Sequence, residues 1–325
     1  MSSYDVAVIG AGVHGASVAF HLANRGVRTV VIERTSPAGG PTGRSSAIVR
    51  AYYTNAFLAA VARDSIAMFR DFERHTGRDA GFRETGLLVL HPPEDEATVR
   101  EVVPRLNDQG IPTDLLEPQQ VVAEWPAFDL DGIAIAAFER DAGYADPVLT
   151  TQGLLERARE LGAEIRLGHG VTAIEPEGSA WTVSTTDASV AAEHVLIAAG
   201  PWSAPLAAMV GADLPLTVER HIVATFAWSD DNRVPAHGDL PNGYYFRPEG
   251  DELFPTLPTF DGPEQASRQL RWWLDHDPER ERAAEKAREA GIDIARRTVA
   301  KYREAMRIPS SVQRRREKQS PVGVV

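Results

Sequence analysis

The sequence predicts an α/β protein whose N-terminal part is a doubly wound domain built on a parallel sheet. Residues 4–33 contain a strand, a glycine-rich turn, a helix and a second strand, which is the order of a βαβ unit. A later apolar run, residues 194–200, has the composition of a buried parallel strand. The chain has 325 residues and is long enough for two domains, because one hydrophobic core rarely exceeds about 250–300 residues.

The first elements follow each other closely. Residues 4–10 form a short apolar strand, the helix after the turn ends at Gly26, and residues 27–33 form the second strand. Residues 34–46 are rich in Gly, Pro, Ser and Thr, which predicts a loop. Apolar residues then recur at helical spacing over residues 57–72, so that an amphipathic helix is expected there.

Strands and helices alternate in the middle of the chain. A strand is predicted over residues 81–92 and a helix over residues 94–110. Another helix is expected after Asp146, a good N-cap, with Pro147 at the first helical position and Gly162 at the end. Further strands are predicted over residues 163–168, 171–176, 181–186, 216–228 and 243–254.

The composition changes after about Phe254. A Pro/Gly-rich linker comes first, and the residues beyond it are charged and poor in large apolar side chains, which favours helix. The whole chain has a net charge of −12, but residues 296–318 contain nine Lys or Arg against two Glu. Such asymmetry suggests two bodies with different partners.

Composition excludes several kinds of chemistry. The chain contains no cysteine, so it has no disulfide, no thiolate metal site and no cysteine nucleophile. Neither a Ser-His-Asp constellation nor a metal-ligand spacing is legible. No apolar run approaches the roughly 20 residues of a membrane helix, so no membrane partner is expected. The N-terminus lacks a basic region, which predicts no signal peptide and a cytoplasmic location.

The turn after the first strand carries a dinucleotide-binding fingerprint. Gly10, Gly12 and Gly15 form a GxGxxG motif in which Gly10 permits the turn, Gly12 admits the pyrophosphate, and Gly15 lets helix and strand pack. Glu33, at the end of the second strand, stands where a ribose contact is needed. The predicted nucleotide site also includes the neighbouring residues Val13, His14 and Arg34. The alternative is a Rossmann-like core that binds no nucleotide.

This unit alone fits FAD or NAD, because both contain adenosine diphosphate. Later segments are more specific: GGPTGRSSAIVRAYY (residues 39–53), GYADP (143–147), HVLIAAGPWS (194–203) and YYFRPEGD (244–251). In these the chain resembles the D-amino-acid oxidase, glycine oxidase and sarcosine oxidase family of flavoproteins. The resemblance covers residues 4–254 and implies FAD as the cofactor, bound non-covalently, since a cysteinyl bond is excluded.

The resemblance also implies roles for single residues. The residues expected to face the pyrophosphate and flavin are Thr42, Arg44, Ser45 and Ser46. Val171 would offer its backbone to the adenine, and Gly200 and Trp202 would border the cofactor. Arg50 would hold a substrate carboxylate, since a guanidinium binds a carboxylate in a bidentate manner. Its alternatives are a surface ion pair and a cofactor-phosphate contact. Tyr245 and Arg247 would line the substrate pocket, or else belong only to the core.

The implied reaction oxidises the C–N bond of a small amine or amino acid. Hydride passes from the α-carbon to the flavin, and the imine then hydrolyses. The implied domains are an FAD-binding domain (residues 1–85 and 140–210) and an incomplete antiparallel-sheet substrate domain (86–139 and 211–254). Relatives continue with about another hundred residues that this chain is expected to lack, which suggests impaired catalysis or a flavin-binding protein without turnover.

The C-terminal residues suggest a different partner. After a linker or helix (residues 255–276), the segment 277–318 is predicted to be helix-turn-helix-like, with a tail over 319–325. Residues 291–318 resemble the DNA-binding box of the nitrogen-type (sigma-N) sigma factor. Weak DNA contacts would then come from Arg296, Arg297 and Lys301, and the chain would be a chimera with a DNA-binding helix. The alternative is a solvated basic face.

Overall fold

The computed structural model describes residues 2–218, 222–223, 226–227, 234–241, 243–249 and 252–257. The chain divides into two units: Met1–Glu219 with Phe226–Leu257, and Arg220–Thr225 with Pro258–Val325. Of the second unit only the strand β12 (Ile222–Val223) is described. The linker, helix-turn-helix and tail expected beyond residue 257 lie outside the described residues.

The first sheet is the dinucleotide-type sheet that the sequence predicts. Its strands follow the order β8-β2-β1-β11-β10-β9. β8, β2, β1 and β11 run parallel, whereas β10 and β9 continue as antiparallel neighbours. The bounds are Ser2–Ile9 for β1, Thr29–Glu33 for β2, Glu164–Leu167 for β8, Val171–Glu177 for β9, Ala180–Thr185 for β10 and Ser189–Ile197 for β11. The run at 194–200 is parallel as predicted, but its residues are only half-buried or exposed.

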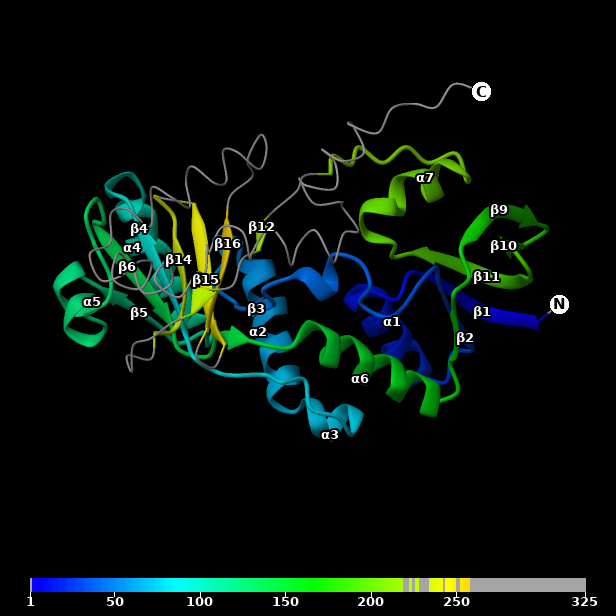
Figure 1. The fold of residues 1–325 in the computed structure, drawn as a ribbon, viewed down its shortest axis with the longest axis horizontal. Coiled ribbons are helices and arrows are strands. Elements are labelled where there is room, and N and C mark those ends of the chain that lie inside the picture. The colour runs from blue at the N-terminus through cyan, green and yellow to red at the C-terminus, as the bar shows by residue number, and fades with distance from the viewer. Residues whose placement is uncertain are drawn as a thin grey trace, which may run out of the picture. The chain divides into compact units, whose positions relative to one another are not determined.

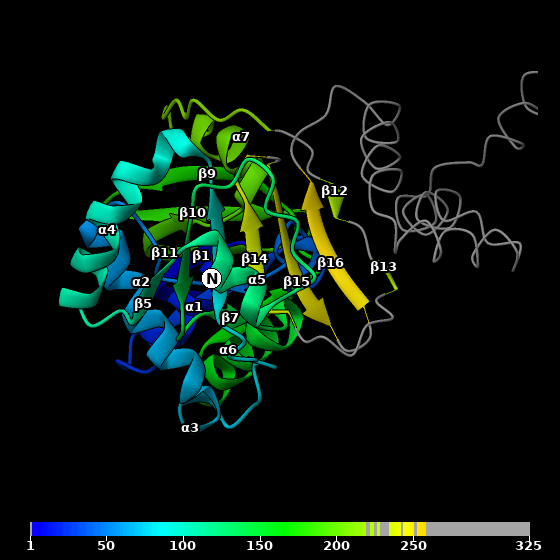
Figure 2. The ribbon, with the colours of Figure 1, turned by 90° about the vertical axis from the view of Figure 1, so that its left-hand side faces the viewer.

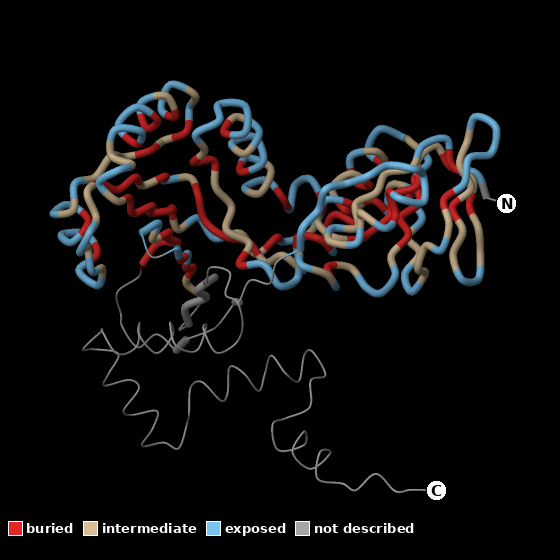
Figure 3. The backbone as a smooth tube through the Cα atoms, turned by 90° about the horizontal axis from the view of Figure 1, so that it is seen from above, coloured by how far each residue is buried: buried red, intermediate tan, exposed pale blue. Residues whose placement is uncertain are grey.

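Helices cover one face of this sheet. Alternate side chains of β1 point to opposite faces, so Val8 packs with α1 (Val13–Ala23) and α6 (Pro147–Glu160), whereas Ile9 packs with β9, β10 and α7 (Ser203–Ala208). Figure 1 shows α1 and α6 beside each other along the sheet. Figure 3 shows buried residues mainly in the interior of the described chain and exposed residues along its periphery. β1 is thus fixed from both sides and holds the turn that follows it.

The second sheet has the order β16-β15-β14-β4-β6-β5, with β13 also paired to β16. β14 runs parallel to β4 and the other pairs are antiparallel, so the expected antiparallel sheet is mixed. A parallel pair needs a long crossover, and the chain passes through the first sheet between β4 and β14. The bounds are Leu87–His91 for β4, Thr113–Leu116 for β5, Ile135–Glu139 for β6, Phe226–Ala227 for β13, Ala236–Asp239 for β14, Tyr244–Glu249 for β15 and Glu252–Leu257 for β16.

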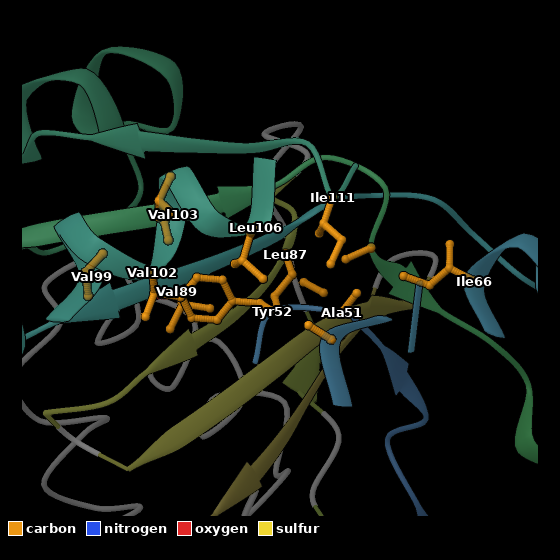
Figure 4. Close-up of a cluster of buried hydrophobic side chains, with 14 of the residues drawn as sticks. Ala51, Tyr52, Ile66, Leu87, Val89, Val99, Val102, Val103, Leu106 and Ile111 are labelled. Carbon is orange, nitrogen blue, oxygen red and sulfur yellow. The ribbon is translucent and has the colours of Figure 1, made fainter. Parts of the chain in front are cut away.

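Both faces of β4 are buried. Leu87 and Val89 pack with α4 (Glu96–Asp108) and α2 (Ala56–Arg70), while Leu88 and Leu90 pack with α5 (Pro118–Glu124). Figure 2 shows the strands of this sheet with α4 and α5 around them. The cluster between α4 and β4 also takes in Ala51 and Tyr52 (Figure 4).

Several connecting elements differ from the prediction. The helix expected over residues 57–72 is interrupted at Asp71, which separates α2 from α3 (Phe72–Thr76). The segment 94–110 begins as a 3₁₀ turn, η2 (Pro93–Asp95), before α4. Of the described residues in 216–228, only β12 and β13 are strand. The remaining elements are η1 (Thr42–Arg44), β3 (Ile48–Val49), β7 (Gly143–Tyr144) and η3 (Gly200–Trp202).

The predicted start of α6 is confirmed. The Asp146 side chain accepts hydrogen bonds from the N–H groups of Val148 and Leu149, at 2.8 and 2.9 Å, and Pro147 is the first helical residue. Within the described part of the chain, no helix has both the length and the apolar character needed to cross a bilayer.

Candidate active site

The turn between β1 and α1 is packed so tightly that two of its glycines cannot be replaced. Gly10 has φ +108°, and a Cβ there would lie 2.5 Å from the carbonyl oxygen of Ala198 in the segment after β11. A Cβ at Gly15 would overlap the carbonyl oxygen of Gly10. The close approach of helix, strand and turn predicted for a GxGxxG motif is therefore present.

The N-terminus of α1 opens at this turn. Gly12 is its N-cap and supplies no side chain, and the first helical turn contains no acidic residue. The N–H of Val13 donates to Thr42 Oγ1 at 3.2 Å, so the loop after β2 reaches the helix end. His14 is exposed on the helix surface. Unsatisfied N–H groups and the helix dipole make such an N-terminus suited to phosphate.

Glu33 points at the turn. Its Oε2 accepts from the N–H of Ala11 at 2.9 Å, and its Oε1 accepts from the N–H and hydroxyl of Thr35 at 2.8 and 3.0 Å. The carboxylate is half-buried. An acid at the end of the second strand thus lies beside the glycine turn, as a ribose contact requires.

Arg34 and Trp202 join three segments at the same edge of the first sheet. The guanidinium carbon of Arg34 lies 4.8 Å from the centre of the Trp202 ring. A Cβ on Gly40 would lie 3.5 Å from that ring, and one on Gly170 would lie 3.5 Å from Arg34 Cγ. Val171, the first residue of β9, adjoins this contact.

Two further expected residues lie in the loops after β2 and β11. Arg44 Nη1 donates to the carbonyls of Gly39 and Gly40, at 3.1 Å each, and Gly200 has φ +54° at the start of η3. Together, the amides, the acid, the guanidinium groups and the tight glycines fit the adenosine diphosphate half of a dinucleotide.

Ser45 and Ser46 continue the same loop. Ser45 Oγ accepts from the N–H of Ala47 at 2.9 Å, and Ser46 is buried. The Ala47 carbonyl accepts from the N–H of Ala145 at 3.0 Å. The loop therefore leads directly into the short β3–β7 ribbon, in which Ile48 is paired with Tyr144.

Arg50 directly follows this ribbon. Its side chain is half-buried, donates to the carbonyl of Tyr52, and lies over the Tyr53 ring with 4.3 Å between guanidinium carbon and ring centre. Among the residues that the structure describes, no carboxylate lies within 4.0 Å of the guanidinium. The surface ion pair considered from the sequence is therefore not formed with any described residue.

β15 brings one of its two expected residues to the ribbon. Tyr245 and Arg247 lie on the same face of β15 because they are two residues apart. Arg247 is buried, and its guanidinium carbon lies 4.5 Å from the centre of the Tyr144 ring. Tyr245 is 43% exposed. The structure thus places Arg247 on the strand pair that precedes Arg50.

Sequence reasoning missed Glu139, the last residue of β6. It is fully buried. Its Oε1 accepts from the N–H of Ala51 and its Oε2 accepts from the N–H of Tyr52, both at 2.8 Å. Burial raises the pKa of Glu139 to about 7. An acid at the end of an apolar strand is the signal that identified Glu33, and residues 133–139 (IAIAAFE) show the same pattern without a glycine motif.

A second buried polar contact lies next to it. Tyr52 Oη and His91 Nε2 are 3.1 Å apart, and His91 Nδ1 is 3.4 Å from Asp95 Oδ2. Burial lowers the pKa of His91 and raises the pKa of Tyr52. Burial thus favours the uncharged form of both side chains.

Comparisons with known proteins agree with this geometry. A family model described as "FAD dependent oxidoreductase" matches residues 5–305. Dimethylglycine dehydrogenase of Rattus norvegicus is 28% identical over 276 residues, which are 82% of this chain and 32% of that protein. Monomeric sarcosine oxidase of Streptomyces avermitilis is 26% identical over 279 residues, 82% of this chain and 69% of that protein.

The chain thus spans about a third of the first relative and about two thirds of the second. The solved structure of L-proline dehydrogenase from P. horikoshii has the same fold, with a TM-score of 0.74 and 21% identity over 84% of this chain and 77% of that one.

The match corrects the expectation for the C-terminal segment. It extends about 50 residues past Phe254, where the resemblance was expected to end, and runs into the segment 291–318. The comparisons give no support to a sigma-N DNA-binding box, and Arg296, Arg297 and Lys301 lie outside the described residues. Because the family model matches most of this chain, the chain belongs to the FAD-dependent oxidoreductase family.

Proposed function

We propose that this chain binds FAD non-covalently and oxidises the C–N bond of a small N-methylated amino acid. Membership of the FAD-dependent oxidoreductase family supports the cofactor and the reaction type. The names of two relatives support the substrate class, because dimethylglycine and sarcosine are both N-methylated glycines with a free carboxylate. The absence of cysteine supports non-covalent binding, since it removes the cysteinyl attachment.

The placement of Arg50 is the observation that carries the proposal. It follows β3, which continues the loop of Thr42, Arg44 and Ser46 at the cofactor site. A half-buried arginine without a carboxylate partner among the described residues retains donors for a ligand. Its planar fork suits the carboxylate of an amino acid.

The other residues would divide into cofactor binding and substrate orientation. The amides at the start of α1 and the carboxylate of Glu33 would hold the phosphates and the adenosine ribose. Bound FAD supplies the acceptor for the two electrons and the hydrogen that leave the substrate carbon. Arg50 would fix the carboxylate end of the substrate, and the buried Arg247 would support the β3–β7 ribbon through the Tyr144 ring.

Spectroscopy of the purified chain tests this proposal. The FAD-loaded protein should be yellow, and sarcosine or dimethylglycine added without oxygen should bleach the visible flavin band. Arg50→Ala should retain the colour but slow bleaching at least tenfold, because it removes the carboxylate anchor.

Three results would contradict the proposal. If the purified chain does not bind FAD, the proposed cofactor is wrong. A yellow chain that none of these amino acids bleaches would be a flavin-binding protein without this activity. Equal bleaching of the Arg50→Ala variant and the unmodified chain would leave Arg50 without its role.

A further inference from the structure

We propose that Glu139 is a positioning residue for Arg50. The buried carboxylate of Glu139 accepts hydrogen bonds from the backbone N–H groups of Ala51 and Tyr52, and in this way it fixes the Arg50 guanidinium for binding a substrate carboxylate. The inference rests on the proposed function, because it takes Arg50 as the carboxylate anchor. Glu139 itself would touch neither substrate nor cofactor. It would act entirely through the segment that carries Arg50.

The two amides belong to buried residues. Ala51 is 0% and Tyr52 9% exposed, and both belong to the apolar cluster between α4 and β4. Figure 4 shows Ala51 and Tyr52 with Leu87, Val89 and Leu106 around them. A buried amide without an acceptor is costly, and among the described residues the acceptor of both amides is Glu139.

Glu139 lies on a strand that has a neighbour on each side. β6 lies between β4 and β5, and Glu139 is paired in register with Leu87 on one side and Thr113 on the other. Its side chain points to the same face as Ile135 and Ala137, which also belong to the apolar cluster. A carboxylate on a strand that is paired on both sides therefore holds a segment that has no strand pairing of its own after β3.

The Arg50 guanidinium is tied to the segment that Glu139 holds. Arg50 donates to the carbonyl of Tyr52, and the N–H of Tyr52 donates to Glu139 Oε2 at 2.8 Å. A movement of this segment would therefore carry the guanidinium with it. The positive charge of Arg50 also lowers the pKa of Glu139, against the larger effect of burial, so the two groups interact electrostatically.

A neutral amide in place of the carboxylate would disturb this arrangement without opening a cavity. In Glu139→Gln one of the two side-chain positions becomes an NH₂ donor facing a backbone N–H that is also a donor. The segment would have to move to relieve that contact. Binding of a substrate carboxylate should weaken about tenfold, whereas the distant cofactor contacts of Glu33 should be unaffected.

The test measures the affinity of the FAD-loaded full chain for propionate, a small carboxylate, from the change in the flavin spectrum. Four proteins are compared: the unmodified chain, Glu139→Gln, Arg50→Ala and the double variant. Asp5→Asn is the control, because Asp5 also accepts from a backbone N–H, that of Arg28 at 2.8 Å, but lies half-buried on β1 of the first sheet. The melting temperature and the FAD affinity of each protein are measured in parallel.

The expected result is a non-additive cycle. Glu139→Gln should raise the propionate Kd about tenfold, Arg50→Ala should raise it further, and the double variant should match Arg50→Ala. FAD affinity should be unchanged throughout, and Asp5→Asn should bind propionate like the unmodified chain. If Glu139→Gln does not fold, Glu139→Asp, which keeps the charge one methylene short of the amides, should give the same pattern.

The contrary results are distinct. If Arg50→Ala weakens propionate but the Glu139 variants do not, the positioning role is wrong and the proposed function stands. If the losses add in the double variant, or FAD affinity falls in parallel, Glu139 has only a structural role. If Arg50→Ala leaves the propionate Kd unchanged, the proposed role of Arg50 fails and this inference fails with it.

Discussion

Glu33 and Glu139 hold backbone in the same way in two different parts of the molecule. Each is the last residue of a strand. Glu33 accepts from the N–H groups of Ala11 and Thr35, and Glu139 accepts from those of Ala51 and Tyr52. Glu33 is half-buried at an open turn, whereas Glu139 is fully buried in an apolar cluster. The same local bonding thus occurs both at an open turn and in an apolar core.

The tight glycine turn beside Glu33 should be the feature most sensitive to change. Gly15→Val would drive side-chain atoms into the carbonyl of Gly10, so the turn could not form and FAD binding should be lost. The flavin content of the purified variant measures this. Gly238→Ala is the matched control, since the nearest atom to its Cβ lies 4.0 Å away. Retention of FAD by Gly15→Val would contradict the packing of this site.

Removal of the Glu139 carboxylate should lower the free energy of unfolding but leave FAD binding unchanged. Glu139→Ala orphans the amides of Ala51 and Tyr52, and an unsatisfied buried donor costs about 1–3 kcal/mol, so the loss should be about 3 kcal/mol. Urea unfolding measures the free energy of unfolding, and FAD titration measures the cofactor site. A variant as stable as the unmodified chain would show that other groups satisfy these amides.

The raised pKa of Glu139 predicts a pH dependence of stability. Because burial raises its pKa to about 7, the folded state binds the proton more tightly than the unfolded state. The contribution of this group is complete below its unfolded pKa and is lost as the pH rises through about 7. Arg50 opposes this shift and Asp141 adds to it.

Glu139→Gln does not titrate and isolates the effect. Between pH 5 and pH 8, the unmodified chain should lose about 2 kcal/mol of stability relative to Glu139→Gln. Unfolding free energies of both proteins across this range are the measurement. His91, whose pKa burial lowers, is present in both proteins, so its effect should cancel in the difference. A constant difference across the range would mean that Glu139 has an ordinary pKa.

A third acid, Asp146, tests the role of burial, and its removal should have the smallest effect on the free energy of unfolding. Asp146 also holds two backbone amides, but it is half-exposed at the start of α6. Asp146→Ala should lower the free energy of unfolding by about 1 kcal/mol, as for other N-caps. A loss as large as that of Glu139→Ala would show that burial does not distinguish these acids.

Local signals in the sequence were sufficient for the first sheet and the turn of Gly10, Gly12 and Gly15. The cap of Asp146 was also predictable, because its geometry depends only on neighbouring residues. The parallel pairing of β14 with β4 was not, since strand direction depends on a crossover through another sheet. The break at Asp71 was missed because the apolar spacing continues from α2 into Phe72.

The candidate site divides in the same manner. The position of Glu33 could be predicted because an acid at the end of the second strand is expected beside a GxGxxG turn. Glu139 could not, because its partners, the amides of Ala51 and Tyr52, are 88 and 87 residues away and carry no side-chain signature. Backbone amides look alike in every sequence, so only the fold reveals which acid they meet.

Titration of FAD into the apo forms of the unmodified chain and Glu33→Ala tests whether the glycine turn and Glu33 hold the cofactor. We expect the unmodified chain to bind FAD and Glu33→Ala, with its fold intact, to bind it at least tenfold more weakly, since a hydrogen bond to a charged group contributes about 1.5–3 kcal/mol. An unmodified chain that does not bind FAD, or a Glu33→Ala variant that binds it equally well, would show that this turn and this acid are not the FAD site.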